Sequence, residues 1–321
     1  MDVSVLVPTY NRAHYIGATL RTLLGQTQPP AEIVIVDDGS TDNTADVVAE
    51  FDHPSIRYIS STNAGCTAAR QKAMDHASCD WIAFCDSDDL WEPEKLELHA
   101  RLVELEEVHF AFSNFRIVQE DEWEDRTKFD DAPEGYFDGV RRLEEGLAVF
   151  DGPMYPRLLR FQPIFASTML MNRRWIERFG ALDVAFSRMQ SEDFEFALRC
   201  TQAGPIGIVT RPVVGIRKHG DNLSGGSSYG FMWSDIRILE HSLEHHPMAK
   251  EYEDAVRASI RGRSAHVAAE AFSDGNYGRC REALERVPWS ARDSRLKVKA
   301  ALSLLPDDVL DWMRGTRERL D

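Results

Sequence analysis

Three aspartates at the end of a short apolar run are the residues best suited to chemistry in this chain. Asp86, Asp88 and Asp89 directly follow residues 81–84, a run that indicates a buried strand. Unit negative charges a few ångströms apart repel by roughly 1 kcal/mol in water and several-fold more in a partly dry cleft, so three of them rarely converge without a counter-ion. Carboxylate oxygens suit Mg²⁺ or Mn²⁺, which also bind phosphate. The cluster predicts a cation site, and the alternative is an acidic turn that points into solvent.

The elements around this cluster form a regular alternation of strands and helices. Apolar runs indicate strands at residues 3–7, 33–36, 56–59 and 81–84, and amphipathic segments indicate helices at residues 15–24, 45–51 and 67–77. Four strands with three crossovers predict a parallel sheet. Ligands of such sheets bind beyond the carboxyl ends of the strands, so the residues that follow each strand become candidates for a site.

The rest of the chain divides into an α/β continuation and a helical tail. We expect a helix with Pro93 at its first position, a strand from Phe110, an irregular and partly mobile insert over residues 119–162, and then further strands at 168–171, 206–209 and 213–216 with helices at 175–179 and 194–201. A helix hairpin is expected from residues 265–272 and 277–287. The glycine and serine run that ends at Ser228 suggests a domain boundary there.

Composition excludes several classes of protein. The chain has 321 residues, a net charge of −16 and no extended basic face. Such a surface argues against a nucleic-acid partner. A nucleotide bound to so acidic a protein would need a metal. Five cysteines without C-x-x-C spacing indicate neither a disulfide framework nor a zinc site. We expect a cytoplasmic protein, because the first strand leaves no room for a signal peptide and no apolar run is long enough to span a bilayer.

Six short motifs in order carry a resemblance to a known family. They are Val-Leu-Val-Pro-Thr-Tyr-Asn-Arg at 5–12, Val-Asp-Asp-Gly-Ser-Thr-Asp at 36–42, Asn-Ala-Gly at 63–65 with Arg70, Asp-Ser-Asp-Asp at 86–89, Ser-Glu-Asp at 191–193 and His-Gly-Asp-Asn-Leu-Ser at 219–224. Together they resemble glycosyltransferase family two, the inverting enzymes of the GT-A fold.

The resemblance implies a fold and a domain organisation. The fold is α/β, a Rossmann-like three-layer sandwich with a mixed, mostly parallel sheet, followed by a C-terminal helical appendage. Residues 1–228 would be the glycosyltransferase domain, with 1–106 as its nucleotide-binding half and 107–228 as its acceptor half. Residues 229–321 would be the helical region.

The resemblance also implies which residues meet a nucleotide sugar. These are Pro8, Thr9, Tyr10, Arg12, Asp37, Asp38, Asn63, Gly65, Arg70, Asp86, Ser87 and Asp89, while Asp88, Asp86 and His219 would hold Mn²⁺ or Mg²⁺. Three of these assignments have a structural alternative: Pro8–Tyr10 could merely end a strand, Arg70 could face solvent, and His219 could be an exposed loop histidine. Gln71 departs from the family, in which asparagine commonly follows the arginine.

Two neighbouring acids are the candidates for the catalytic base. An inverting displacement needs one carboxylate within hydrogen-bond reach of the attacking hydroxyl, and the resemblance favours Asp193, with Glu192 second. The alternative is structural: Ser191 would be an N-cap, and acids in a first helical turn stabilise the helix dipole by roughly 0.3 to 1 kcal/mol. The two interpretations are compatible, because a helix N-terminus also keeps a carboxylate ionised.

The expected function is metal-dependent transfer of a hexose or N-acetylhexosamine from a nucleotide sugar, a UDP-sugar above all, to a hydroxyl acceptor. Saccharide, lipid-linked and protein acceptors all stay open, as does peripheral association with the inner face of the membrane. A sugar-nucleotide pyrophosphorylase is a weaker alternative, because the segment after the first strand lacks a glycine-rich phosphate loop. A non-catalytic nucleotide-sugar-binding or scaffold protein is the other.

Overall fold

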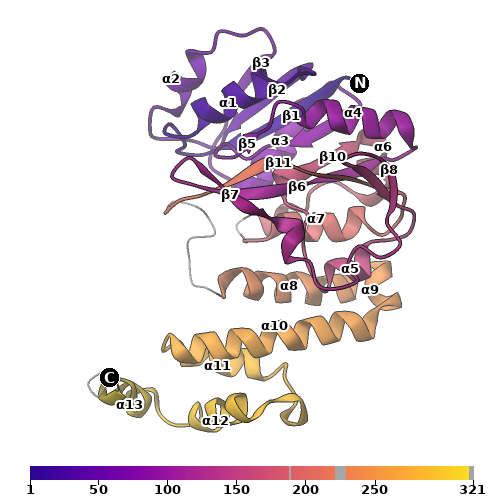
Figure 1. The fold of residues 1–321 in the computed structure, drawn as a ribbon. Coiled ribbons are helices and arrows are strands. Elements are labelled where there is room, and N and C mark those ends of the chain that lie inside the picture. Colours follow the sequence, from indigo (N-terminus) through magenta and orange to yellow (C-terminus); the bar gives the residue numbers. More distant parts are fainter. Residues whose placement is uncertain (188, 221–228, 318–321) are drawn as a thin grey trace. The chain divides into compact units, whose positions relative to one another are not determined.

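The computed structural model describes residues 1–187, 189–220 and 229–317. The chain forms two compact units, Met1–Asn222 and Leu223–Asp321 (Figure 1). The expected boundary at Ser228 and the last four residues of the motif at 219–224 lie outside the described residues.

One mixed sheet organises the first unit. Its main path has the strand order β3-β2-β1-β4-β10-β6-β11-β9-β8, and β5 and β7 pair with β11 and β6. The strands are β1 (Val3–Thr9), β2 (Glu32–Asp37), β3 (Ile56–Ser60), β4 (Trp81–Phe84), β5 (Leu90–Trp91), β6 (Phe110–Gln119), β7 (Glu122–Thr127), β8 (Arg141–Glu144), β9 (Leu147–Phe150), β10 (Met169–Asn172) and β11 (Ile206–Lys218). The first four strands are parallel, β10 runs antiparallel to its neighbours β4 and β6, and β11 is again parallel to β6. This confirms the predicted mixed α/β fold.

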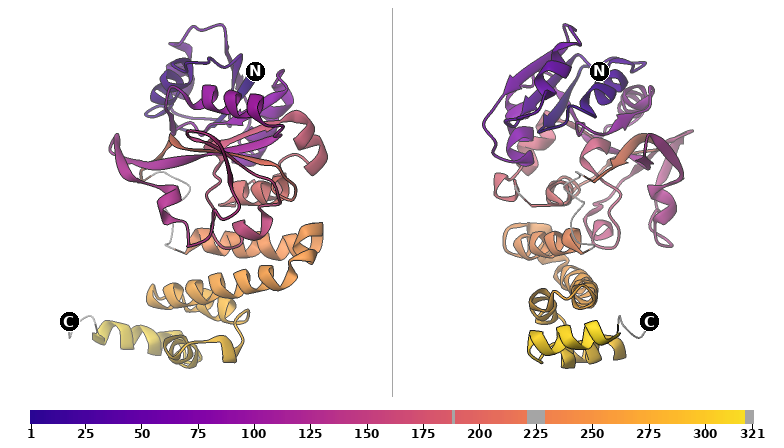
Figure 2. Two further views of the ribbon diagram at one scale, coloured as in Figure 1. Left: turned by 45° about the vertical axis from the view of Figure 1, so that its right-hand side comes forward. Right: turned by 90° about the vertical axis from the view of Figure 1, so that its left-hand side faces the viewer.

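Helices cover both faces of this sheet (Figure 2). They are α1 (Ile16–Leu24), α2 (Thr44–Ala49), α3 (Cys66–His76), α4 (Lys95–Leu105), α5 (Tyr155–Leu158), α6 (Arg173–Phe179) and α7 (Glu192–Cys200), with short 3₁₀ turns η1 (Lys128–Asp131), η2 (Ala166–Thr168) and η3 (Val184–Phe186). Successive strand residues point to opposite faces. Ala83 therefore packs in the core that contains Leu20 of α1, whereas the ring of Phe84 meets that of Phe196 of α7 at 6.0 Å.

The insert at residues 119–162 is more ordered than expected. It contains the β6–β7 hairpin and the β8–β9 hairpin, which extends the sheet through the pairing of β9 with β11. Glu120 and Asp121 both have positive φ, 49° and 68°, in the tight turn between β6 and β7. Glycine or asparagine normally marks such turns, so an acidic pair does not signal one in the sequence.

Two further boundaries differ from the sequence expectation. Helix α4 begins at Lys95 with Glu94 as its N-cap, so Pro93 precedes the helix rather than starting it. The two strands expected at 206–209 and 213–216 are one strand, β11, whose pairing with β6 shifts register around Pro212. Proline has no N–H to give to a ladder, and the strand tolerates it at this irregularity.

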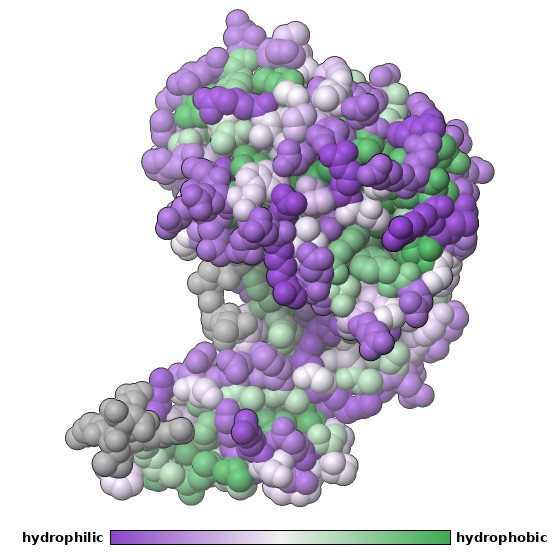
Figure 3. Space-filling view, in the orientation of Figure 1, coloured by the Kyte–Doolittle hydropathy of each residue, from purple (hydrophilic) through white to green (hydrophobic). Residues whose placement is uncertain are grey.

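In the described part of the second unit the regular elements are helical. They are α8 (Gly230–His245), α9 (Pro247–Glu251), α10 (Glu253–Ser273), α11 (Tyr277–Leu284), α12 (Ser294–Leu302) and α13 (Asp307–Arg317), with a 3₁₀ turn η4 (Trp289–Ala291). The expected hairpin is present as α10 and α11, and the side chain of Asn276 caps α11 by accepting from the Arg279 N–H at 3.0 Å. Apolar surface is visible over this unit (Figure 3), and Leu304 and Trp312 are 82% and 69% exposed. No helix among the described residues is long and apolar enough to cross a membrane.

Candidate functional site

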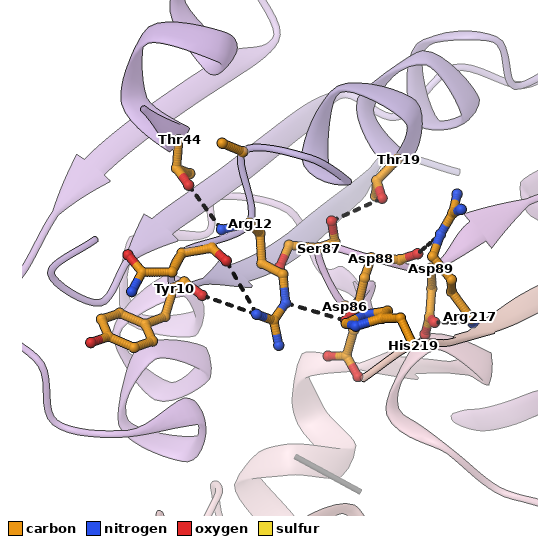
Figure 4. A network of polar contacts seen from close by, with 12 residues as sticks. Tyr10, Arg12, Thr19, Thr44, Asp86, Ser87, Asp88, Asp89, Arg217 and His219 are labelled. Carbon is orange, nitrogen blue, oxygen red and sulfur yellow. Dashed lines mark hydrogen bonds and ion pairs between the residues drawn. The ribbon is translucent and has the colours of Figure 1, made fainter. Parts of the chain in front are cut away.

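The candidate residues meet at one edge of the sheet. Strand β1 lies between β2 and β4, and its register pairs Thr9 with Asp37 and Leu6 with Phe84. The segments that follow these three strands therefore leave the sheet side by side. Figure 4 shows Tyr10, Arg12 and the 86–89 turn in this place, joined by the end of β11.

Asp88 is the centre of the acidic turn. Its Oδ2 lies 3.0 Å from Nε2 of His219 and accepts a hydrogen bond from Nε of Arg12 at 3.3 Å (Figure 4). Burial alone would raise the pKa of Asp88, but the hydrogen bond with His219 and the charge of Arg12 lower it overall. The imidazole of His219 also stacks on the ring of Tyr15, with centroids 4.1 Å apart. The alternative of an exposed loop histidine is therefore wrong.

Asp89 has a different environment from Asp88. It is 3% exposed, its Oδ2 accepts from the Ser167 hydroxyl at 2.5 Å, and its Oδ1 accepts from the Arg217 N–H at 3.1 Å. Burial, and then the charges of Asp88 and Asp86, raise the pKa of Asp89 well above its usual range. Both of its oxygens thus bind protein groups, and this carboxylate ties the acidic turn to η2 and β11. Ser87 is also buried, and its carbonyl accepts from the Thr19 hydroxyl at 3.1 Å.

Arg70 lies under the site and faces two carboxylates. It is 3% exposed, so the alternative of a solvent-facing arginine is wrong. One guanidinium nitrogen donates to Oδ1 of Asp86 at 2.5 Å and the other to Oε1 of Glu192. This buried contact joins α3 to the end of β4 and to the start of α7. It also commits the Glu192 carboxylate to a cation.

Asp193 is placed differently from its neighbour Glu192. Its side chain stays partly exposed, and its Oδ2 accepts a hydrogen bond from the Ala166 N–H at 3.2 Å. Burial, and then the charge of Glu192, raise the pKa of Asp193 to about 7. Ser191 does precede the helix, but it has a φ of 63° and its side chain makes no capping hydrogen bond, so the proposed serine cap is wrong. A carboxylate with this pKa is suited to accept a proton near neutral pH.

The carboxylates after β2 organise the loop that leads into α3. Asp38 accepts from the backbone N–H groups of Ala64 and Gly65, both at 2.8 Å. Asp37 accepts from the N–H of Ser40 at 2.7 Å and from the Tyr58 hydroxyl at 2.5 Å.

The other residues expected at the donor range from exposed to buried. Tyr10 is 44% exposed, as a ring that stacks on a base must be, and Asn63 is exposed, while Pro8 and Thr9 are buried at the end of β1. Gly65 has a φ of +99°, and a Cβ there would lie 2.3 Å from the carbonyl oxygen of Ser187. Only glycine permits this approach.

The residues around Asp88 partly fit a divalent cation. No group of three or more histidine, cysteine or acidic side chains is arranged to hold a metal within residues 1–187, 189–220 and 229–317. The structure brings Asp88 and His219 together, whereas Oδ1 of Asp86 is held by Arg70. One carboxylate and one imidazole in contact, with the partly exposed Asp86 next to them, are nonetheless a donor set that suits Mn²⁺ or Mg²⁺.

Three residues of this site were not found from the sequence. Tyr15, Ser167 and Arg217 each touch a predicted site residue, through stacking, a side-chain hydrogen bond and a backbone hydrogen bond respectively. Arg217 lies in β11 two residues before His219, which directly follows the strand, and this alternate spacing is a usable signal for a shared face. Ser167 lies in a stretch without a recognisable pattern.

Comparison with known proteins decides the family. The model of "Glycosyl transferase family 2" matches residues 4–164, half of the chain. The chain belongs to glycosyltransferase family 2. The match contains the motifs at the ends of β1, β2 and β4.

Curated relatives are similar over shorter stretches. WfgD of Escherichia coli, a UDP-Glc:alpha-D-GlcNAc-diphosphoundecaprenol beta-1,3-glucosyltransferase, is 37% identical over 117 residues, 36% of this chain and 46% of WfgD. The putative teichuronic acid biosynthesis glycosyltransferase TuaG of Bacillus subtilis is 36% identical over 123 residues, 37% of this chain and 48% of TuaG. The chain thus spans about half the length of these two relatives.

Solved structures share the fold. The crystal structure of residues 1–349 of TarS from S. aureus in complex with UDP has a TM-score of 0.64 at 18% identity, covering 100% of this chain and 92% of that one. The complex of the same protein with UDP-GlcNAc has a TM-score of 0.65, covering 99% and 92%.

Proposed function

We propose that this protein transfers a sugar from a UDP-sugar to a hydroxyl acceptor, with inversion at the anomeric carbon and Asp193 as general base. The observation that carries the proposal is the difference between two adjacent acids. Glu192 is paired with the buried Arg70, whereas Asp193 is partly exposed and has a pKa raised to about 7. A base of that pKa is ionised in a useful fraction at neutral pH and still binds a proton well.

The reaction is a single displacement. The acceptor oxygen attacks the anomeric carbon while its proton passes to the Asp193 carboxylate, and the bond between the anomeric carbon and the diphosphate oxygen breaks, releasing UDP. Asp88 and His219, with Asp86 beside them, would hold a divalent cation, which when bound offsets the charge of the diphosphate. The Arg12 guanidinium, 3.3 Å from Asp88, adds positive charge on the same side.

The comparisons support the choice of substrates. The names of WfgD and WfaP, both glucosyltransferases of Escherichia coli, specify UDP-Glc and a diphosphoundecaprenol-linked acceptor, and one solved structure of the fold holds UDP-GlcNAc. We therefore propose a UDP-hexose or UDP-N-acetylhexosamine donor and a saccharide acceptor, lipid-linked before protein-linked, in the synthesis of a cell-envelope polysaccharide. A net charge of −16 supports a role for Mn²⁺ or Mg²⁺ in binding the nucleotide. We also propose a cytoplasmic location, with at most peripheral contact with the inner face of the membrane.

Thermal stability in the presence of UDP tests the donor site. A ligand that binds only the folded state raises the melting temperature by mass action, so UDP with Mn²⁺ should stabilise the protein more than either alone. In the variant Asp88→Asn, the additional rise in melting temperature that Mn²⁺ causes should be lost. The variant Asp130→Asn, an exposed aspartate outside the site, should retain it.

Two outcomes would contradict the proposal in different ways. No shift with UDP under any metal condition would remove the donor assignment. A shift with UDP and Mn²⁺, without hydrolysis or transfer of any UDP-sugar, would instead favour the non-catalytic nucleotide-sugar-binding protein.

A further inference from the structure

A pocket lined by none of the proposed donor residues lies in the first unit, and we call it the lysine pocket. It has a volume of about 240 Å³ and is formed by β6, β7, η1, the end of β11 and the segment before η2. Its apolar wall consists of Phe115, Ile117, Phe165 and Ile216, and two lysines, Lys128 and Lys218, also line it. Ligand pockets for drug-sized molecules are roughly 300 to 1,000 Å³, so this one suits a single sugar ring with a small substituent.

The pocket borders the proposed active site at two points. Phe165 directly precedes Ala166, whose N–H donates to Asp193. Lys218 directly precedes His219, which contacts Asp88. Side chains alternate along β11, so Arg217 and His219 reach the acidic turn while Ile216 and Lys218 face the pocket. An acceptor seated here would have the base at one side and the diphosphate side of the donor at the other.

Basic side chains outnumber acidic ones in this pocket: Arg126, Lys128 and Lys218 line it beside Glu124 and Asp131. Residues 1–222 contain four lysines, Lys72, Lys95, Lys128 and Lys218, and two of the four line it, in a chain with a net charge of −16. An excess of basic over acidic side chains in one pocket of an acidic protein favours an anionic ligand.

Lys128 has aromatic rather than acidic neighbours. Its ammonium lies 4.6 Å from the ring centroid of Phe161 and 6.0 Å from that of Phe165, and no carboxylate of the described residues is within ion-pair distance of it. Asp131, which also lines the pocket, is paired with Arg126 at 2.6 Å. Burial and the positive charge of Lys218 both lower the pKa of Lys128. The negative charge of Asp131 opposes them but does not cancel them. A bound anion would offset the desolvation of the Lys128 ammonium and its repulsion by Lys218.

We propose that this pocket binds the phosphate-bearing sugar of the acceptor, with the sugar ring against Phe165 and the phosphate between Lys128 and Lys218. Lysine acts on phosphate as a point charge, whereas a planar carboxylate is better matched by the fork of an arginine. Two ammonium groups match the two negative charges of a diphosphate that links a sugar to a lipid, and equally those of a sugar monophosphate, which carries about −1.5 to −2 charges at pH 7. The assignment of this sugar as the acceptor depends on the proposed transferase function, but the binding itself does not.

Equilibrium binding to the full chain tests the site without any turnover. The probes are N-acetylglucosamine 1-phosphate, N-acetylglucosamine and glucuronic acid, each titrated calorimetrically in the presence of saturating UDP and Mn²⁺, so that the donor site is filled. We expect the sugar phosphate to bind at least about tenfold more tightly than the neutral sugar. A factor of about ten in affinity is what one hydrogen bond to a charged group contributes. Lys128→Met should abolish this preference and Lys128→Arg should keep it. Lys250→Met, which removes an exposed lysine of the second unit, should also keep it.

Three results would overturn the proposal. A preference that survives in Lys128→Met would place the phosphate elsewhere. A preference seen only without UDP would assign it to the donor site. Equal affinity for glucuronic acid would show a general anion site rather than a phosphate site. Failure of the transferase function would appear instead as absent turnover of UDP-sugars, while the sugar-phosphate preference and its loss in Lys128→Met would remain.

Discussion

Two adjacent acids at the start of α7 differ because only one of them meets a cation. Glu192 contacts Arg70, whereas the described hydrogen bond of Asp193 comes from the neutral N–H of Ala166. The paired acid is buried against Arg70, and the pKa of the other acid is raised to about 7. Sequence spacing cannot separate neighbours in one helical turn, since Arg70 lies 122 positions before Glu192.

The pKa of Asp193 sets the expected pH dependence of transfer. The base must be deprotonated, so kcat/KM should fall about tenfold per pH unit below pH 7 and level off above it. The folded-state pKa, about 7, exceeds the ordinary value of 3.8, so the protonated form is favoured in the folded protein and this group's contribution to stability is lost as the pH rises through 7. Rates measured from pH 5 to 9 test this, and a profile that is flat down to pH 5 would contradict it.

At the scale of elements, one arginine connects three parts of the fold. Arg70 of α3 pairs with Asp86 after β4 and with Glu192 of α7. Removing one partner of a buried ion pair leaves an uncompensated charge, which costs about 3 to 5 kcal/mol. We expect Arg70→Met to lower the free energy of unfolding by about that amount in urea titrations.

An exposed arginine provides the matched control for Arg70. Arg101 is 46% exposed in its side chain and pairs with Glu144, so Arg101→Met should lower the free energy of unfolding far less than Arg70→Met does. Equal losses of unfolding free energy in the two variants would show that the buried ion pairs of Arg70 stabilise the fold no more than an exposed pair does.

The turn before α3 requires glycine at position 65, because the backbone there has a positive φ and lies close to another segment. Gly65→Ala forces a Cβ to within 2.3 Å of the Ser187 carbonyl oxygen at a φ of +99°. We expect a loss of stability of roughly 1 to 3 kcal/mol, the usual cost of such a conformation, and weaker UDP binding.

Gly262 of α10 is the control for Gly65, because a Cβ there meets no atom within 4 Å. Gly262→Ala should stabilise the helix by roughly 0.5 to 1 kcal/mol and leave UDP binding unchanged. Calorimetric unfolding of both variants checks the pair. Stabilisation by Gly65→Ala would contradict the close approach.

At the scale of the whole molecule, the sequence predicted the buried strands better than the exposed ones. Strands β1, β2 and β4 lie within two residues of the expected bounds, because strands buried on both faces appear as continuous apolar runs. The hairpins between residues 119 and 150 were missed, since β7 and β8 are polar and exposed and give no such run.

The site was predictable in its motifs but not in its contacts. Residues directly after β1, β2 and β4 were expected together because parallel strands end at one edge, and the register confirms this. The pairing of Arg70 with Glu192 and the role of Ser167 depend on how distant segments pack, which local spacing does not encode. The two lysines of the lysine pocket are 90 positions apart, so their proximity is likewise not encoded in local spacing.

The most direct test of the account is the transfer rate of Asp193→Asn beside that of the wild type, with UDP affinity measured in parallel. Removing a general base typically costs 10²- to 10⁴-fold in rate, so we expect a loss in this range with UDP binding unchanged. The variant should also be more stable than the wild type at pH 8, where the wild-type carboxylate is charged. A transfer rate within about threefold of the wild type would contradict the central claim that Asp193 takes the acceptor's proton.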